Sequence, residues 1–188
     1  MITTREAATA LYGAYRLARV DERGMDFFDT SIEGFWRSFY AAALVAPLYL
    51  ILMVTRFQAA GVQASGLQFV AVEAIGYVIA WVAFPVVVAY IAPMIERDHR
   101  YLRYIVAYNW ASVLQNSLCL PIAILINLGA ISSSLATLLG VGCFVVVSVY
   151  TWYVTRVALD VPGGTAAGFV ALDVVLSVIV NAWADTMV

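Results

Sequence analysis

Five long apolar runs alternate with short polar segments along the chain. A transmembrane helix needs about 20 apolar residues to cross the ~30 Å hydrocarbon core of a bilayer. Each run reaches that length, and the runs cover about residues 36–55, 67–95, 104–127, 135–157 and 166–185. The pattern therefore predicts an all-α membrane protein in which residues 31–188 form a bundle of five transmembrane helices.

Residues 1–30 precede the first run and have a different pattern. Between residues 4 and 20, small and apolar side chains recur at helical spacing, with the arginines mostly opposite. This is typical of an amphipathic helix that lies in the membrane interface or binds a partner, although such a helix can also pack against the bundle's own loops. The apolar stripe is Ala7, Leu11, Ala14, Tyr15 and Ala18, and the polar side is Arg5, Thr9, Arg16 and Arg19.

The basic residues, all of them arginines, predict the orientation in the membrane. Nine of the ten fall in segments that would share one side, and only Arg56 falls on the other. Cytoplasmic loops carry an excess of basic residues, so we expect a cytoplasmic N-terminus and an external C-terminus. Arginine without lysine also favours a bacterial genome, and hence the bacterial inner membrane. The nine are Arg5, Arg16, Arg19, Arg23, Arg37, Arg97, Arg100, Arg103 and Arg156.

The composition narrows the class of protein further. Apolar residues make up 64% of the chain and charged residues 12%, against about 45–50% and about 25% in soluble domains. The mean hydropathy is +0.91. The formal net charge is −2, which gives no basic surplus for neutralising phosphates. These values exclude a soluble enzyme domain, a disordered tail and a nucleic-acid binder.

Reactive side chains are too few to indicate catalysis. His99 is the only histidine, and it lies in the polar segment between the second and third runs. Cys119 and Cys143 each lie inside an apolar run, where a thiol behaves as a small hydrophobe, so we expect no disulfide and no zinc site. The chain contains no nucleophile, phosphate-loop or dinucleotide motif. We therefore expect no enzyme activity, no cofactor and no metal.

Polar side chains inside the predicted spans are the candidate functional residues. Glu73 in the second span and Asp173 in the fifth are intramembrane acids, which are costly to bury. Their positions place them about 10 Å apart in height, which predicts two separate polar sites rather than a carboxylate pair. Asn109, Gln115 and Asn116 lie in the third span at comparable heights. We expect the face shared by Asn109 and Asn116 to point toward the second and fifth spans.

Two interpretations of these polar residues stay open. Amides often hydrogen-bond neighbouring transmembrane helices, which would make them structural. An ion or solute path would instead place them around a water-accessible cavity, whereas a dry and tightly packed bundle would argue against it. Glycines at residues 164 and 168 form a GxxxG pattern, which favours close helix packing within the chain or, alternatively, contact with a second copy.

The layout resembles the Yip-type family of five-span membrane proteins over about residues 36–185. The resemblance rests on the cytoplasmic N-terminal segment, the short loops, the run YVTRVAL at residues 153–159 and the polar-aromatic start RYIVAYNWASVLQN at residues 103–116. Yip-type proteins are known mainly from membrane traffic, and many bacterial members are uncharacterised. The resemblance implies an adaptor or membrane-organising role with no catalytic residues. Of the N-terminal segment, only its presence matches the family, since its long, arginine-bearing amphipathic helix has no counterpart there.

Two functional hypotheses follow. The first is a non-enzymatic adaptor, assembly or membrane-organising factor that acts through lipids or a cytoplasmic protein partner, with a homo-oligomer as a further option. Its candidate contact residues are Arg5, Leu11, Tyr15, Arg16, Arg19, Arg97, Arg100 and Arg103. The alternative is a small transporter or channel subunit with a polar path at Glu73, Asp173, Asn109 and Asn116.

Overall fold

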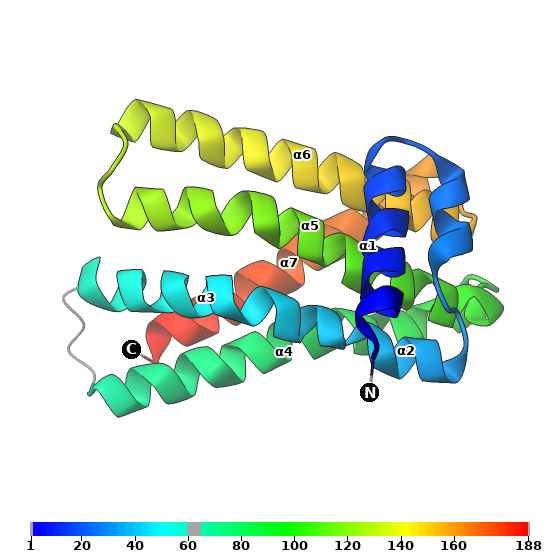
Figure 1. Ribbon diagram of the computed structural model, residues 1–188, viewed down its shortest axis with the longest axis horizontal. Helices are drawn as coiled ribbons and strands as arrows, with labels where there is room; N and C mark the ends of the chain where they lie inside the picture. The colour runs from blue at the N-terminus through cyan, green and yellow to red at the C-terminus, as the bar shows by residue number, and fades with distance from the viewer. Residues whose placement is uncertain (1, 60–64, 188) are drawn as a thin grey trace.

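The computed structural model describes residues 2–59 and 65–187 (Figure 1). Within these ranges the chain is helical, with no strand. In chain order the elements are α1 (Thr4–Ala18), η1 (Glu22–Phe27), α2 (Ile32–Ser38), α3 (Tyr40–Ala59), α4 (Gly66–Met94), η2 (Asp98–Arg100), α5 (Tyr101–Asn127), α6 (Ser133–Leu159) and α7 (Gly163–Thr186).

The predicted number of spans is confirmed, because the described residues contain five helices long and apolar enough to cross a membrane. The first crossing combines α2 and α3 over Ile32–Gln58. It begins earlier than residue 36 because Ser31 caps it, accepting a hydrogen bond from the Gly34 amide at 3.0 Å. The other four crossings are formed by α4, by η2 with α5, by α6 and by α7.

The five crossings form a ring. Neighbours around it pack in the order α3, α5, α6, α7 and α4, and the ring closes through a lighter contact between α4 and α3. The long helices lie side by side in Figure 1. Helices α5 and α7 pack little against each other, which leaves room between them. Outward-facing side chains such as Leu50, Val54 and Val141 are exposed and apolar, as a surface in contact with lipid requires.

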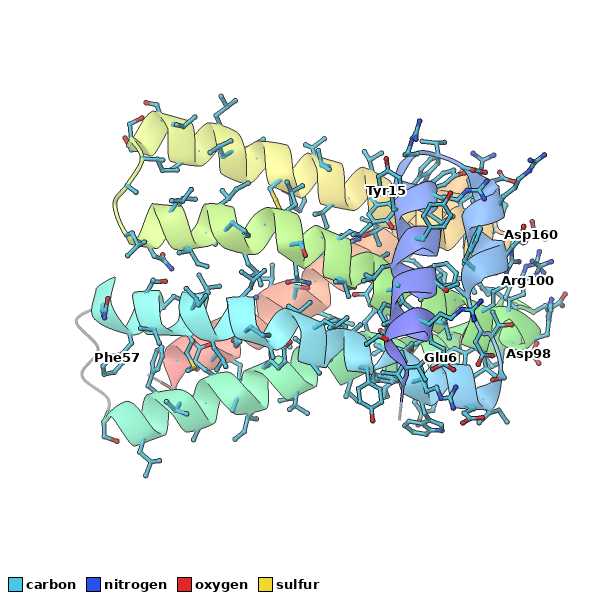
Figure 2. All side chains as sticks on the ribbon, viewed as in Figure 1. Glu6, Tyr15, Phe57, Asp98, Arg100 and Asp160 are labelled. Carbon is cyan, nitrogen blue, oxygen red and sulfur yellow. A yellow bond between two sulfur atoms is a disulfide. The ribbon has the colours of Figure 1, made fainter. Side chains whose placement is uncertain are left out.

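The two ends of the bundle differ in charge. Figure 2 shows Asp98, Arg100 and Asp160 together at one end, while Phe57 lies toward the other. We call the first the basic end. The α4–α5 and α6–α7 connections and η1 meet there, with Arg23 in η1, Arg97 and Arg100 in the α4–α5 connection, and Arg156 in the last turn of α6. The other is the opposite end, where α5 joins α6.

Helix α1 lies across the spans near the basic end (Figure 1). It packs against η1, α5 and α6, and it buries Ala10, Ala14 and Leu17. The Tyr150 hydroxyl donates to the Ala14 carbonyl at 2.7 Å. The predicted apolar stripe is therefore rotated: Tyr15 is 50% exposed and Ala18 is also exposed. The small side chains at positions 10 and 14 allow a close helix approach that the tyrosine would prevent.

The start of α1 is fixed by a capping box and an ion pair. The Thr3 hydroxyl accepts from the Glu6 amide at 3.2 Å, and the Glu6 carboxylate accepts from the Thr3 amide at 2.7 Å. These contacts with Thr3 hold the pKa of Glu6 below its usual value. Arg37 of α2 also donates to Glu6 at 2.7 Å. Helix α1 is thereby tied to the first crossing.

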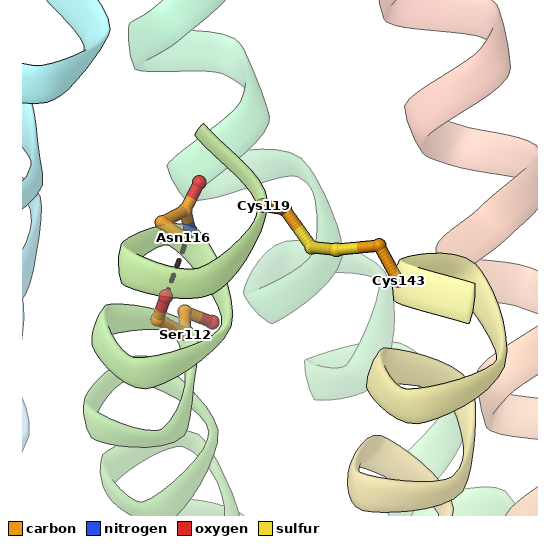
Figure 3. The surroundings of a disulfide bond; sticks show 4 residues. All are labelled: Ser112, Asn116, Cys119 and Cys143. Carbon is orange, nitrogen blue, oxygen red and sulfur yellow. Dashed lines mark hydrogen bonds between the residues drawn. A yellow bond between two sulfur atoms is a disulfide. The ribbon is translucent and has the colours of Figure 1, made fainter. Parts of the chain in front are cut away.

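A disulfide joins Cys119 of α5 to Cys143 of α6, with their Cα atoms 6.1 Å apart (Figure 3). The prediction of no disulfide is therefore wrong. Hydropathy identifies each cysteine as part of an apolar run, but it says nothing about how the two helices are rotated toward each other. Both residues lie at similar distances from the α5–α6 connection, so the antiparallel pair brings them to the same height.

The backbones of α1 and η1 approach closely at two glycines. A Cβ atom on Gly24 would lie 2.5 Å from the Gly13 carbonyl oxygen, a backbone atom that cannot turn aside. We expect Gly24→Ala to lower the free energy of unfolding by about 2 kcal/mol through overpacking. Thermal unfolding in detergent measures this, with Gly164→Ala as the control, because a Cβ there meets nothing within 4 Å. Equal effects of the two substitutions would contradict the close approach.

The same geometry corrects the expectation for the GxxxG pattern. A Cβ atom on Gly164 or on Gly168 would meet no other atom within 4 Å. These glycines therefore do not mediate close packing between helices of this chain, and that prediction is wrong. Contact with a second copy through them stays a prediction.

Candidate functional site

A polar cavity lies inside the ring of crossings. Its volume is about 380 Å³, within the range of about 300–1,000 Å³ that is typical of ligand pockets. All five crossings contribute side chains to it, so it belongs to the bundle as a whole. Its polar lining consists of Tyr49, Arg56, Glu73, Tyr77, Tyr108, Ser112, Gln115, Asn116, Asp173, Ser177 and Asn181.

Glu73 lines the part of the cavity that lies nearer the α5–α6 connection, at the opposite end of the bundle. Its side chain is 2% exposed. The Tyr49 hydroxyl donates to Glu73 Oε2 at 2.5 Å. Arg56 Nη1 lies 3.0 Å from Oε1, an ion-pair distance without the alignment of a hydrogen bond. Charge compensation of this kind is what allows a carboxylate to be buried away from water.

Arg56 extends this contact to a third helix. Its Nη2 donates to Asp185 Oδ1 of α7 at 2.9 Å, while Nη1 faces Glu73 of α4. One guanidinium on α3 therefore connects α3, α4 and α7 near the lightest contact of the ring. Since α3 and α4 pack little against each other, this ion-pair network closes the ring there.

Asp173 has a different environment in the same cavity. It is half-buried, and one of its oxygens accepts from the Tyr108 hydroxyl at 2.8 Å. Within residues 2–59 and 65–187, no arginine or histidine nitrogen lies within 4.0 Å of its carboxylate. The partner of Asp173 is therefore the neutral Tyr108 hydroxyl, whereas Glu73 also has the cationic Arg56 as a partner.

An aromatic cluster closes the cavity toward the basic end. Phe84 of α4 stacks on Tyr108 at 4.5 Å between ring centroids, and Tyr104 lies 6.0 Å from Phe169 of α7. Phe84, Tyr104 and Phe169 are buried. Tyr104 and Phe169 each lie one helical turn nearer the basic end than the cavity residues Tyr108 and Asp173. The cluster therefore separates the cavity from that end.

The cavity contains four of the five polar residues singled out from the sequence. Glu73, Asp173, Gln115 and Asn116 all line it. The two acids bind different partners, but they share one cavity, so describing them as separate sites is only partly right. Gln115 also donates to Thr151 at 3.0 Å, and Asn116 to the Ser112 carbonyl at 2.8 Å (Figure 3).

Asn109 does not take part, which corrects the prediction for its helix face. It is fully buried and donates to the Ser38 hydroxyl of α2 at 2.8 Å. The α5 face that carries Asn109 and Asn116 reaches the cavity only at Asn116. Nearer the basic end, at Asn109, α5 packs against α2 and α3. Sequence reasoning also missed Tyr49, Arg56 and Tyr108 as partners. A tyrosine in an apolar run does not by itself indicate a polar partner. Arg56 was interpreted only as marking the end of the first span.

The candidate contact residues at the N-terminal segment and loops are spread over several environments. Arg5 and Tyr15 are exposed on α1, Arg19 is exposed at its C-terminal cap, and Leu11 is partly buried. Arg16 binds Asp21 at 2.7 Å, next to the start of η1. Arg97, Arg100 and Arg103 lie together at the basic end.

The described ranges hold no group of three or more His, Cys, Asp or Glu side chains that could bind a metal ion. No protein-family model, curated protein or solved structure matches the chain.

Proposed function

We propose that the protein is a small transporter or channel subunit that holds a small cation or protonated amine in the cavity between its crossings. The observation that carries the proposal is a cavity of about 380 Å³ lined by the intramembrane acids Glu73 and Asp173. A bundle with purely structural polar residues would pair them tightly and leave no space. Buried ionisable residues that face a cavity are typical of ion and proton pathways.

The charges favour a cation over an anion. The lining holds two carboxylates and one guanidinium, and Arg56 is already engaged by Glu73 and Asp185. Asp173 has only the Tyr108 hydroxyl. A cation in the cavity would give Asp173 the opposite charge that its surroundings lack, whereas an anion would face both carboxylates while Arg56 is already engaged.

Passage through the bundle requires the aromatic cluster to open. The cluster blocks the basic end, and α4 carries Phe84 while making only light contacts with α3 and α5. Movement of α4 with α7 would separate Phe84 from Tyr108 and expose Asp173 to the basic end. Rigid-body displacement of one helix pair against the rest is a common way of changing access.

The proposal includes an orientation with the basic end in the cytoplasm of a bacterial inner membrane. The arginine distribution supports it. The disulfide gives independent support, because Cys119 and Cys143 lie in the half toward the opposite end, and disulfides persist on the oxidising side of a membrane.

Cation flux into proteoliposomes tests the proposal. We expect purified protein to carry Na⁺ or protons above the rate of protein-free vesicles. Asp173→Asn preserves the shape and removes the charge, so it should lower that flux at least about tenfold. Glu73→Gln should lower it as well.

The matched control is Asp98→Asn, which removes a carboxylate that is 71% exposed in η2, away from the cavity. Its flux should equal that of the unmodified protein. Flux that is unchanged in Asp173→Asn, or equal to that of empty vesicles throughout, would refute a transport role.

The adaptor role that a Yip-type relationship implies is the second candidate. The outer face of α1 favours it, since Tyr12 and Tyr15 are each 50% exposed beside Arg5 and Arg19. Deleting residues 1–24 would not test it cleanly, because Leu17 is fully buried and its loss would destabilise the bundle. Tyr15→Ala together with Arg19→Ala changes only that face, and loss of a co-purified partner in this variant would support the adaptor role.

A further inference from the structure

The basic end holds a second and larger concavity, separate from the polar cavity. Its volume is about 820 Å³, and η1, the α4–α5 connection, the first turn of α5, the end of α6 and the start of α7 surround it. We call it the arginine basin. Half of the arginines in the chain line it, together with three acids. They are Arg23, Arg97, Arg100, Arg103 and Arg156, with Glu22, Asp26 and Asp160.

Topology alone does not explain this arrangement. The preference for basic residues in cytoplasmic loops requires arginines somewhere in each loop. It does not require arginines from four separate segments to converge on one concavity, where they repel one another. Convergence of like charges is costly unless an opposite charge compensates it.

The acids in the basin compensate only some of the arginines. Asp160 serves two of them: its carboxylate lies 3.2 Å from Arg100, and its backbone carbonyl accepts from Arg97 at 3.1 Å. In the part of the chain that the structure describes, no carboxylate lies within 4.0 Å of the guanidinium nitrogens of Arg23, Arg103 or Arg156. Three guanidinium groups thus keep donors available to a ligand.

Two further donors border the basin. Tyr153 is 8% exposed, and its buried hydroxyl has no hydrogen-bond partner among the described residues. Leaving a buried hydroxyl without a partner is costly, so such a group indicates a missing one. Helix α7 begins at the basin with Pro162, which provides no side-chain cap for the first amides. An uncapped helix N-terminus favours a negative charge nearby.

We propose that the arginine basin binds a phosphate-bearing anion, supplied either as the headgroup of an anionic phospholipid or as a soluble phosphate compound. Guanidinium groups bind phosphate oxygens in pairs, and the Tyr153 hydroxyl adds one more donor. The volume exceeds what a single inorganic ion fills and suits a headgroup or a diphosphate. In the proposed orientation the basin faces the cytoplasm at headgroup level, where basic pockets between transmembrane helices bind anionic lipids.

The test measures binding to purified full-length protein in neutral detergent. Inorganic pyrophosphate is titrated calorimetrically, and thermal unfolding is followed with pyrophosphate and, separately, in micelles containing phosphatidylglycerol or phosphatidylcholine. We expect saturable stabilisation by a phosphate-bearing anion, since a ligand that binds only the folded state raises the unfolding midpoint. Stabilisation by pyrophosphate identifies a soluble ligand, and stabilisation by phosphatidylglycerol alone identifies a headgroup.

Variants distinguish the basin from general attraction of anions. The double substitution Arg103→Gln with Arg156→Gln should abolish the stabilisation by the anion. Neither guanidinium is paired with a carboxylate in the described structure, so both are available to bind the anion. Arg5→Gln with Arg19→Gln removes the same charge from exposed positions on α1 and should leave it unchanged. An equal loss in both double variants would overturn the proposal, as would the absence of stabilisation by either ligand.

Tyr153→Phe keeps the proposal testable if the arginine variant fails to fold. It removes only the hydroxyl without a partner, so the unliganded protein should unfold at an unchanged or higher temperature. Affinity for the stabilising anion should fall about tenfold, the usual effect of losing one hydrogen bond to a charged group. An affinity that stays the same would contradict the role of Tyr153, whereas a purely structural role predicts an effect on stability alone.

Discussion

Arg56→Gln is expected to lower the free energy of unfolding by about 3 kcal/mol, because it leaves a buried carboxylate without its counter-charge. Glu73 is 2% exposed and would keep only the Tyr49 hydroxyl as a partner. The substitution also removes the link between α3 and α7 through Asp185. Thermal or denaturant unfolding in detergent measures the loss, which we place at the lower end of the usual range since Arg56 is itself partly exposed.

A double-mutant cycle separates this electrostatic effect from lost packing. Adding Glu73→Gln to Arg56→Gln removes the stranded charge, so the double variant should recover more than half of the lost stability. Asp185→Asn is the matched control: its carboxylate is 63% exposed, and exposed ion pairs are worth about 0–1 kcal/mol. If Arg56→Gln costs no more than Asp185→Asn, the buried pair does not stabilise the bundle.

The crossings were predictable because hydropathy acts locally. A run of apolar residues must span the bilayer as a helix, whatever its neighbours are, so five runs predict five spans and approximate bounds. Glu73 and Asp173 could be identified as candidates for the same reason: an acid in such a run is unusual regardless of the fold. Gln115 and Asn116 followed from their heights along one helix.

The partners of these residues were not predictable, because they depend on how helices are rotated and ordered. Asn109 and Asn116 share one face of α5, yet the first meets Ser38 and the second meets the cavity, since different helices cover that face at different heights. Arg56 reaches Glu73 from the end of a span by virtue of its long side chain. The rotation of α1 depends likewise on where small residues allow close contact.

The cavity and the arginine basin lie at different heights, and we propose that they bind ligands of opposite charge. The aromatic cluster of Phe84, Tyr104, Tyr108 and Phe169 separates the cavity from the basic end. The basin lies around the connections of α4, α6 and α7. A ligand in the basin would therefore hold together the ends of the helices whose movement opens the cluster. This connection would let an anion at the basic end influence access to the cavity.

Cys119→Ser is expected to destabilise the bundle by about 3 kcal/mol, the usual contribution of a disulfide that closes a loop of this length. The bond joins α5 and α6 across a sequence separation of 24 residues. Removing it enlarges the conformational freedom of the unfolded chain, while the interface between α5 and α6 keeps its other contacts. Reduction of the unmodified protein should give the same loss in thermal unfolding, and Cys119→Ser should then be insensitive to reductant.

Cys143→Ser provides the matched comparison, because both cysteines contribute to stability through the same disulfide bond. Either single substitution and the double substitution should cost the same amount, whereas two independent buried thiols would give additive losses.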